Sequence, residues 1–416
     1  MNDMQAVLYD ICIIGAGPSG LAAAIESSRR GLSCVVVDRN KKPLKKLYAT
    51  GNGRCNLTND VWSDDVYYDN SFVDEVYESL YQKTNLRPRN FILKYFEELG
   101  IKTVNLNGYY YPMSLQASSV AWAILDAVKT EEIEMVSGFE AESVIRNSEG
   151  YYEIISKGSE EEEPSSVYAR SVVLSIGGLS GKGLGEADIE TTIGLLNSLD
   201  IGFNFFEPGL CPIYIEQDLS SLSGVRFKAG VKIDDHYEEG EIQVTDCGLS
   251  GIVIFNMSRF VEKGCRIHVD VIRNISIDEF VKAFNDIKDV IPDRSLVGFL
   301  NGFINDKLAK FFAYDFLGEL CDTVKLKDMN EDGIRRLYEN LIDWELNVSG
   351  RFGFDSSQAT IGGIKTELIN PKTMKLIGTK DIYVTGEITD VIGKCGGYNL
   401  TYAFISGYLA GSSIML

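Results

Sequence analysis

The chain has 416 residues and a formal net charge of −20, from 60 acidic and 40 basic side chains. This length suggests two or three domains, and the hydrophobic fraction of 45% is typical of a globular protein. A surface this acidic repels phosphate backbones and anionic membranes, so it disfavours nucleic acid as a partner. No apolar run reaches about 18 residues, so we expect no membrane-spanning helix.

Cysteine and histidine usage limits the chemistry further. Eight cysteines are scattered without a CxxC pair, and the only histidines are His236 and His268. This pattern disfavours a zinc site, a dithiol pair and a disulfide framework, so we expect no metal. With no visible export signal, we expect a reducing cytoplasm. The sequence identifies no catalytic residue and leaves the oligomeric state open.

The stretch from Tyr9 to Asn40 carries the strongest signal. "ICIIG" and "CVVVD" predict strands buried on both faces, and "LAAAIESSRRG" between them predicts a helix. The first strand runs into GAGPSG, a GxGxxG pattern, and the second ends at Asp38. This order within about 30 residues is that of a dinucleotide-binding unit, although the motif alone does not separate NAD from FAD.

Each part of the motif has a mechanical reason. Gly15 permits the tight turn, Gly17 lets a pyrophosphate approach the backbone, and Gly20 lets helix and strand pack closely. The helix N-terminus offers free N–H groups to phosphates. Asp38 is expected to accept hydrogen bonds from ribose hydroxyls.

The middle of the chain divides into two kinds of sequence. The elements predicted up to 177 are a helix at 87–100, a tyrosine-rich strand at 108–114, a helix at 115–130, a meander at 132–158 and a buried strand from 167. From about 192 to 348, short strand-like runs are followed by helical stretches, without a recognisable catalytic spacing. This predicts a separate inserted lobe, a candidate lid or substrate wall.

Residues 381–411 predict a strand, a glycine–acid turn, a glycine loop and an apolar helix. Such a segment can complete the first sheet. Its carboxylates, Glu387 and Asp390, are then expected to reach ribityl hydroxyls. The helix N-terminus would face the N1/O2 edge of a flavin, where it favours negative charge. The alternative is an ordinary βα unit with a glycine-rich loop.

Three motifs after GAGPSG, namely "GNGRCNLTN", "GGIKTELINPKTM" and "GEITDVIGKCGGYNL", carry a family resemblance. Together they resemble the BaiN/YhiN-type (aminoacetone oxidase-like) FAD-binding flavoproteins over essentially the whole chain. The resemblance implies an α/β fold, with a bipartite glutathione-reductase-type Rossmann FAD-binding domain interrupted by an inserted β-barrel-plus-helices domain. The implied boundaries are 1–191 and 349–416 for the FAD-binding domain and 192–348 for the inserted substrate or lid domain.

The resemblance also implies which residues hold FAD. The pyrophosphate is expected on Gly15, Gly17, Pro18, Ser19 and Gly20, the ribose on Asp38, the adenine on the backbone of Ala141, and the ribityl and ring end on Gly386, Glu387, Asp390, Gly397, Tyr398, Asn399 and Leu400. The other predicted cofactor-binding residues are Arg39, Lys46, Asn52, Gly53, Arg54, Cys55, Asn56, Gly177 and Gly178.

The loop "GNGRCNLTN" is expected to pass beside the flavin. Gly51 and Gly53 would let its backbone close on the cofactor, and Arg54 would pair with a phosphate or with substrate charge. Cys55 has no neighbouring histidine signal, so we predict a packing role for it and not a nucleophile. The nearby tyrosines at 109–111 could stack on flavin or substrate, but packing on a sheet face is the favoured interpretation.

These features predict an FAD-dependent oxidoreductase that transfers hydride between a small organic substrate and flavin N5. Two directions stay open: reduction of a conjugated C=C bond, or oxidation of an amine with oxygen as acceptor. No second nucleotide-binding fold is visible, so NAD(P)H would bind only transiently as electron donor. The alternatives are a non-catalytic FAD-binding or redox-sensing module and an RNA-modifying flavoprotein, which the net charge of −20 disfavours.

Overall fold

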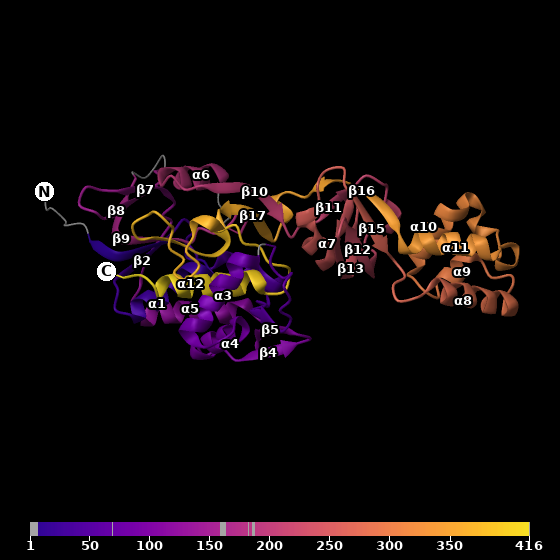
Figure 1. Ribbon diagram of the computed structural model, residues 1–416, viewed down its shortest axis with the longest axis horizontal. Helices are drawn as coiled ribbons and strands as arrows, with labels where there is room; N and C mark the ends of the chain where they lie inside the picture. Colours follow the sequence, from indigo (N-terminus) through magenta and orange to yellow (C-terminus); the bar gives the residue numbers. More distant parts are fainter. Residues whose placement is uncertain (1–6, 69, 159–163, 182, 185–187, 416) are drawn as a thin grey trace. The chain divides into compact units, whose positions relative to one another are not determined.

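The computed structural model describes residues 7–68, 70–158, 164–181, 183–184 and 188–415. It contains two compact units, one formed by Met1–Gly209 with Gln358–Leu416 and the other by Leu210–Ser357 (Figure 1). The sequence places the boundaries near 192 and 348. The first unit here extends to Gly209 because β10 (Phe203–Gly209) pairs in antiparallel fashion with β17 (Ala359–Ile364).

The first unit is built on a seven-stranded sheet in which β6, β2, β1 and β9 lie in that order and β8 and β7 follow. Its strands are β1 (Leu8–Ile14), β2 (Cys34–Asp38), β6 (Glu134–Ser137), β7 (Ala141–Arg146), β8 (Tyr152–Ser156), β9 (Ser166–Leu174) and β18 (Ile382–Val384). β18 pairs in parallel with the last three residues of β9. The C-terminal segment therefore completes the sheet that the N-terminal segment begins, as the sequence predicts.

The prediction of a meander over 132–158 is wrong for its first strand. β6 pairs in parallel with β2, whereas only β7 and β8 form an antiparallel hairpin, which then joins β9. The physical reason is that α5 (Ala117–Thr130) precedes β6 and carries the chain back to the starting edge of the sheet. A strand that follows such a crossover enters the sheet parallel to its partner.

The carboxyl ends of β1, β2, β9 and β18 lie at the same edge because these strands are parallel. Residues Ile11–Ile14, Val35–Val37 and Val172–Leu174 are almost completely buried, which fits a central parallel sheet covered on both faces. In open α/β sheets ligands bind outside this edge. The glycine motifs predicted from the sequence follow these strand ends.

Helices and two small sheets complete the first unit. The helices are α1 (Pro18–Arg29), α2 (Lys45–Ala49), α3 (Asn70–Thr84), α4 (Pro88–Glu98), α5, α6 (Ile189–Ser198) and α12 (Tyr398–Gly411). Besides the β10–β17 pair, β3 (Thr58–Asn59), β5 (Tyr109–Pro112) and β4 (Thr103–Leu106) form an antiparallel sheet. The helices predicted at 87–100 and 115–130 and the tyrosine-rich strand are confirmed.

α1 and α12 pack backbone against backbone. A Cβ atom on Gly407 would lie 2.1 Å from the Ser19 carbonyl oxygen, and one on Gly411 would lie 2.4 Å from that of Ala23. Both contacts advance by four residues in the same direction, so the two helices run parallel. Glycine at 407 and 411 is what permits this close approach.

The second unit contains a closed antiparallel barrel in the order β11, β14, β13, β12, β15, β16. Its strands are β11 (Ile213–Ile215), β12 (Arg226–Ile233), β13 (His236–Thr245), β14 (Gly248–Ser250), β15 (Arg266–Asp270) and β16 (Trp344–Arg351), and its helices are α7 (Ile252–Met257), α8 (Ile277–Val290), α9 (Leu296–Leu300), α10 (Asp306–Leu317) and α11 (Glu331–Ile342). This confirms the predicted Rossmann-type α/β fold with an inserted barrel and helices.

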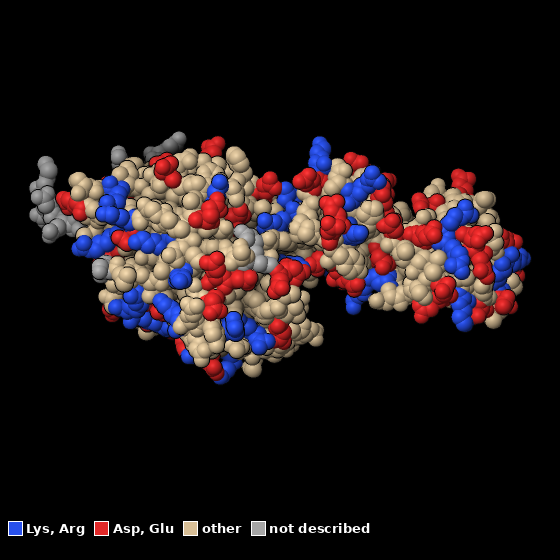
Figure 2. Space-filling view, viewed as in Figure 1, with Lys and Arg blue, Asp and Glu red and all other residues tan. Residues whose placement is uncertain are grey.

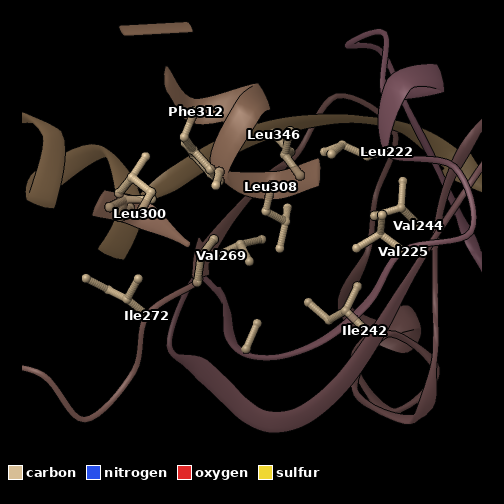
Figure 3. Close-up of a cluster of buried hydrophobic side chains, with 14 of the residues drawn as sticks. Leu222, Val225, Ile242, Val244, Val269, Ile272, Leu300, Leu308, Phe312 and Leu346 are labelled. Carbon is tan, nitrogen blue, oxygen red and sulfur yellow. The ribbon is translucent and has the colours of Figure 1, made fainter. Parts of the chain in front are cut away.

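One apolar core runs through the second unit. Figure 3 shows Leu308 and Phe312 of α10 beside Val269 and Leu346 of the barrel strands. All four side chains are at most 2% exposed. The barrel and the helices are thus held together by shared burial. Over the described ranges, the structure contains no helix with the length and apolar character that crossing a bilayer requires.

Candidate functional site

The glycine loop between β1 and α1 contains two kinds of glycine. A Cβ atom on Gly15, whose φ is +111°, would lie 2.3 Å from the Ser175 carbonyl oxygen, and one on Gly20 would lie 2.0 Å from the Gly15 oxygen. Packing within the protein therefore requires both. Gly17 has an ordinary φ of −83°, and a Cβ atom there would meet nothing within 4 Å. The chain's own packing does not require glycine at 17, which leaves room for close approach by a ligand.

The first turn of α1 begins at this open position. Gly17 provides no side-chain cap, Pro18 occupies the first turn, and no acidic residue follows there. An uncapped helix N-terminus presents N–H groups and a partial positive charge. The buried Ser19 lies in the same turn. This end of the helix is suited to an anionic group such as a pyrophosphate.

Asp38 lies at the end of β2, directly against the glycine loop. One carboxylate oxygen accepts the Ala16 N–H at 2.7 Å and the other accepts the Asn40 N–H at 2.6 Å. Each oxygen has a second lone pair for another donor. The carboxylate is thus fixed in orientation and can still accept a hydrogen bond from a hydroxyl group.

The segment before Ala141 lies beside the end of β2. The Phe139 N–H donates to the Asp38 carbonyl at 2.9 Å, and the Arg39 guanidinium is 3.6 Å from the Glu140 carboxylate. Ala141 itself begins β7 and is 7% exposed. The structure therefore brings Ala141 close to Asp38 in space, although a hundred residues separate them in sequence.

A second cluster is organised by the Glu387 carboxylate, which follows β18. One oxygen accepts from the Ser180 hydroxyl at 3.0 Å and the Thr360 N–H at 2.9 Å. The other accepts from the Gly178 N–H at 3.2 Å and the Lys46 ammonium at 3.4 Å. Lys46 also donates to the Gly178 carbonyl at 2.7 Å. We call this set the Glu387 brace; it ties the ends of β9 and β18 to β17.

The glycines at the end of β9 are also of two kinds: one is required by packing within the protein, and the other has open space beside it. A Cβ atom on Gly178 would lie 2.4 Å from the Thr360 hydroxyl and 2.7 Å from the Glu387 carboxylate, so the brace requires glycine there. Gly177, with φ of +73°, has nothing within 4 Å of such an atom. Sequence reasoning missed Thr360 and Ser180, because only the pairing of distant strands brings them to this point.

The N-terminal and C-terminal segments of the first unit come close together at Gly386. A Cβ atom on this residue, whose φ is +73°, would lie 2.4 Å from the Ser19 hydroxyl. Asp390 is directed elsewhere: its oxygens accept from the Gly362 N–H at 3.0 Å and from the Asn204 amide at 2.7 Å. Of the two predicted carboxylates, Glu387 therefore holds the strand ends together, whereas Asp390 binds Gly362 of β17 and Asn204 of β10.

Like α1, α12 begins at a glycine, Gly397, which provides no side-chain cap. A Cβ atom on Gly397 would lie 2.9 Å from the Thr58 nitrogen and 3.0 Å from the Asn56 amide oxygen. The Tyr398 hydroxyl donates to the Val61 carbonyl at 2.7 Å. What this helix end offers a ligand is its backbone and its dipole.

The side chains of the next two residues of α12 make contacts within the protein. The Asn399 amide accepts the Gly393 N–H at 2.7 Å and donates to the Gly393 carbonyl at 2.9 Å. Leu400 is 9% exposed. The Asn399 side chain therefore fixes the glycine loop that precedes the helix.

The N-termini of α1 and α12 are staggered along a common direction. Ser19 lies opposite Gly407, nine residues after the start of α12. Ser19 is itself one residue after the start of α1, so the two helix starts are offset by eight residues. At 1.5 Å per residue, the first turn of α12 lies about 12 Å beyond that of α1. Two positive helix ends at this spacing fit a long cofactor with a pyrophosphate in the middle and an electron-accepting ring at one end. FAD is such a cofactor.

The loop after α2 has an unusual backbone. Gly51, Asn52, Gly53 and Cys55 all have φ between +55° and +81°, a region that non-glycine residues rarely adopt. Residues 51–54, including Arg54, are exposed, whereas Cys55 is fully buried. Burial raises the pKa of the Cys55 thiol to about 12, so it is protonated at neutral pH. This agrees with a packing role and not with a nucleophile.

A Rossmann-type sheet, a glycine loop with one open position and two uncapped helix ends are the features of a dinucleotide-binding protein. The chain belongs to the HI0933-like family, because the model of the HI0933-like protein Rossmann domain matches residues 9–413. The family resemblance predicted from the three motifs is thereby confirmed. Members of this family are FAD-dependent oxidoreductases, and the residues described above fit FAD.

Similar proteins of known activity match over their full length. The 3-dehydro-bile acid delta(4,6)-reductase of Clostridium scindens is 31% identical over 96% of this chain and 98% of that protein. The ribosomal RNA dihydrouridine synthase of Escherichia coli is 24% identical over 98% of both. Among solved structures, the 3-ketosteroid-delta4-(5alpha)-dehydrogenase of Rhodococcus jostii is 12% identical, with a TM-score of 0.49 over 99% of this chain and 98% of that one.

Proposed function

We propose that this flavoprotein reduces a carbon–carbon double bond conjugated to a carbonyl group in a small organic substrate. One observation carries the proposal: the two relatives above are named for adding hydrogen across such a bond, one in a bile acid and the other in uridine. Their substrates share little else. What full-length relatives with unlike substrates have in common is the chemistry.

The site residues have distinct parts in this proposal. When bound, FAD supplies hydride chemistry. The first turn of α1, beginning at Gly17, would hold the pyrophosphate, and Asp38 would accept the adenosine ribose. The first turn of α12 would favour negative charge at the pyrimidine end of the ring. The Glu387 brace would keep the glycines after β9 in place beneath the cofactor.

A second candidate is the reduction of uridine in RNA, which the dihydrouridine synthase relative favours. The net charge of −20 opposes it, because RNA binding depends on neutralising phosphates. Figure 2 shows acidic side chains interspersed among the basic ones on the face in view. We therefore place a small molecule first. NAD(P)H is proposed only as a transient electron donor.

Anaerobic half-reactions test the proposal. The holoenzyme is reduced with dithionite or NADPH and mixed separately with a conjugated cyclic enone, its saturated ketone and unmodified ribosomal RNA; the oxidised holoenzyme is mixed with a primary amine. We expect the enone to reoxidise the flavin with loss of one enone per flavin, and the saturated ketone to have no effect. Reduction of the oxidised flavin by the amine, with the reduced form inert to the enone, would show an amine oxidase. Reoxidation by RNA alone would favour the second candidate.

A further inference from the structure

The three consecutive tyrosines of β5 do not have equivalent surroundings. The Tyr110 hydroxyl donates to the Asp60 carboxylate at 2.9 Å, and the same carboxylate accepts from Arg89 at 2.7 Å. Successive side chains of a strand point to opposite faces, so Tyr109 and Tyr111 share the other face. Neither of their hydroxyls has a hydrogen-bond partner among the residues that the structure describes. Both side chains are only half-buried.

The face with the unpartnered hydroxyls lies at the predicted ring end of the cofactor site. A Cβ atom on Gly51 would lie 3.6 Å from the Tyr111 ring, and one on Gly396 would lie 3.5 Å from the Tyr109 ring. The two rings therefore contact the left-handed loop on one side and the glycines before α12 on the other. These are the two segments that the cofactor's ring end would approach.

Arg54 adds a charge to this surface. Burial raises the pKa of the Tyr111 phenol, Tyr109 raises it further, and the Arg54 guanidinium acts in the opposite direction. The phenol is consequently protonated at neutral pH. Arg54 belongs to the loop that the Tyr111 ring contacts at Gly51, and its backbone N–H donates to the Gly51 carbonyl at 3.2 Å. Asn52 and Cys55 keep a costly left-handed backbone on either side of Arg54. Such strain is characteristic of segments that place a side chain for function.

We propose that Tyr111 is the acid of the reduction and that Arg54 stabilises the phenolate it leaves. The inference rests on the proposed function. Saturating a conjugated C=C bond adds one hydrogen as hydride, at the carbon distant from the carbonyl, and one as a proton, at the carbon beside it. The Tyr111 O–H bond breaks as that second C–H bond forms. The phenolate then takes a proton from water, so that charge and atoms balance.

Single hydroxyl deletions on the two faces of β5 test this assignment. Tyr111→Phe removes the proposed acid, and Tyr110→Phe removes a hydroxyl that Asp60 already binds on the opposite face. In the reduced holoenzyme, we expect Tyr111→Phe to slow reoxidation by the enone about 100-fold or more. The affinities for FAD and for the saturated ketone, read from flavin absorbance, should change less than about threefold, and Tyr110→Phe should match the wild type.

The pH profile separates an acid from a structural residue. The wild-type rate should fall at alkaline pH as the phenol loses its proton, and Tyr111→Phe should lose that dependence. A Tyr111→Phe rate within about threefold of the wild type, or an equal loss in Tyr110→Phe, would overturn the assignment while leaving the proposed function intact. A wild-type protein that is inert to enones would overturn the proposed function and this assignment together.

Discussion

Four helices of the second unit begin differently from α1 and α12, the two helices of the first unit that would hold a ligand. Four helices of the second unit start at residues whose side-chain oxygens accept a first-turn N–H, namely Ser276, Ser295, Asn305 and Asn330. In the first unit, α1 and α12 start at Gly17 and Gly397, which have no side chain to do so. A side-chain cap stabilises a helix by about 1 kcal/mol. The first unit forgoes this stability at the two helix ends that would hold a ligand.

The glycines of the first unit also serve two purposes, close packing of helices and open space for a ligand. Gly407 and Gly411 let α1 and α12 touch, and Gly20 lets α1 touch the loop before it. Such glycines fix the positions of the helix ends, whereas Gly17 leaves space in front of one of them. The comparison teaches that four helices of the second unit satisfy first-turn N–H groups with their own side chains, whereas α1 and α12 leave theirs available to a cofactor. Three substitutions, one of them with a matched control variant, can break or sharpen this contrast.

The largest effect is expected from Gly17→Glu. The new side chain meets open space in the free protein, so folding should be preserved, but its charge would oppose the pyrophosphate. Two like charges about 4 Å apart near a protein surface repel by about 4 kcal/mol, which corresponds to about a hundredfold or greater loss of FAD affinity. The measurement is FAD titration followed by flavin fluorescence, beside thermal unfolding of the apoprotein. A folded Gly17→Glu protein that retains full yellow colour would contradict the role given to this glycine.

A smaller loss is expected from Gly407→Ala. Its methyl group would lie within 2.1 Å of the Ser19 carbonyl oxygen, which forces α1 and α12 apart. Overpacking of this kind costs about 1–3 kcal/mol. Chemical denaturation should show that loss together with weaker FAD binding, because the stagger of the helix ends changes.

The matched control is Gly194→Ala in α6, where a Cβ atom meets nothing within 4 Å. Alanine is the better helix former by up to about 1 kcal/mol, so this variant should be as stable as the wild type or more so. Equal effects of the two glycine substitutions would contradict the close contact between α1 and α12.

The smallest effect is expected from Ser276→Ala in the second unit. Ser276 and Glu279 form a reciprocal capping box at the start of α8. Its loss should cost about 1 kcal/mol of unfolding free energy. FAD affinity should not change, since the cap serves only its own unit. A parallel loss of FAD binding would show that the two units do not divide stability and ligand binding as proposed.

Much of the first unit could be predicted from sequence because its signals are local. The buried strands ending near Gly15 and Asp38, and the helix between them, follow from apolar runs and glycine spacing within 30 residues. β6 could not be assigned in this way. An apolar strand after a helix has the same local pattern whether it pairs with the next strand or with a distant one, and the choice is made by the crossover.

The candidate site shows the same limit. Sequence motifs point to Glu387, Lys46 and Gly178, but not to Thr360 and Ser180. These two donors reach the Glu387 carboxylate only through the pairing of β9, β17 and β18. Likewise, the roles of Tyr110 and Tyr111 depend on which face of β5 Asp60 covers. Residue types and spacing predict that a site exists. Contacts between distant segments decide which of its groups stay available to a ligand.

A crystal structure of the holoenzyme tests the central claim most directly. The account predicts one FAD per chain, with its pyrophosphate against the backbone at Gly17, its ribose at Asp38 and the pyrimidine edge of its ring at the first turn of α12. FAD density that touches the N-terminus of only one of these two helices, or that lies away from both, would contradict the account.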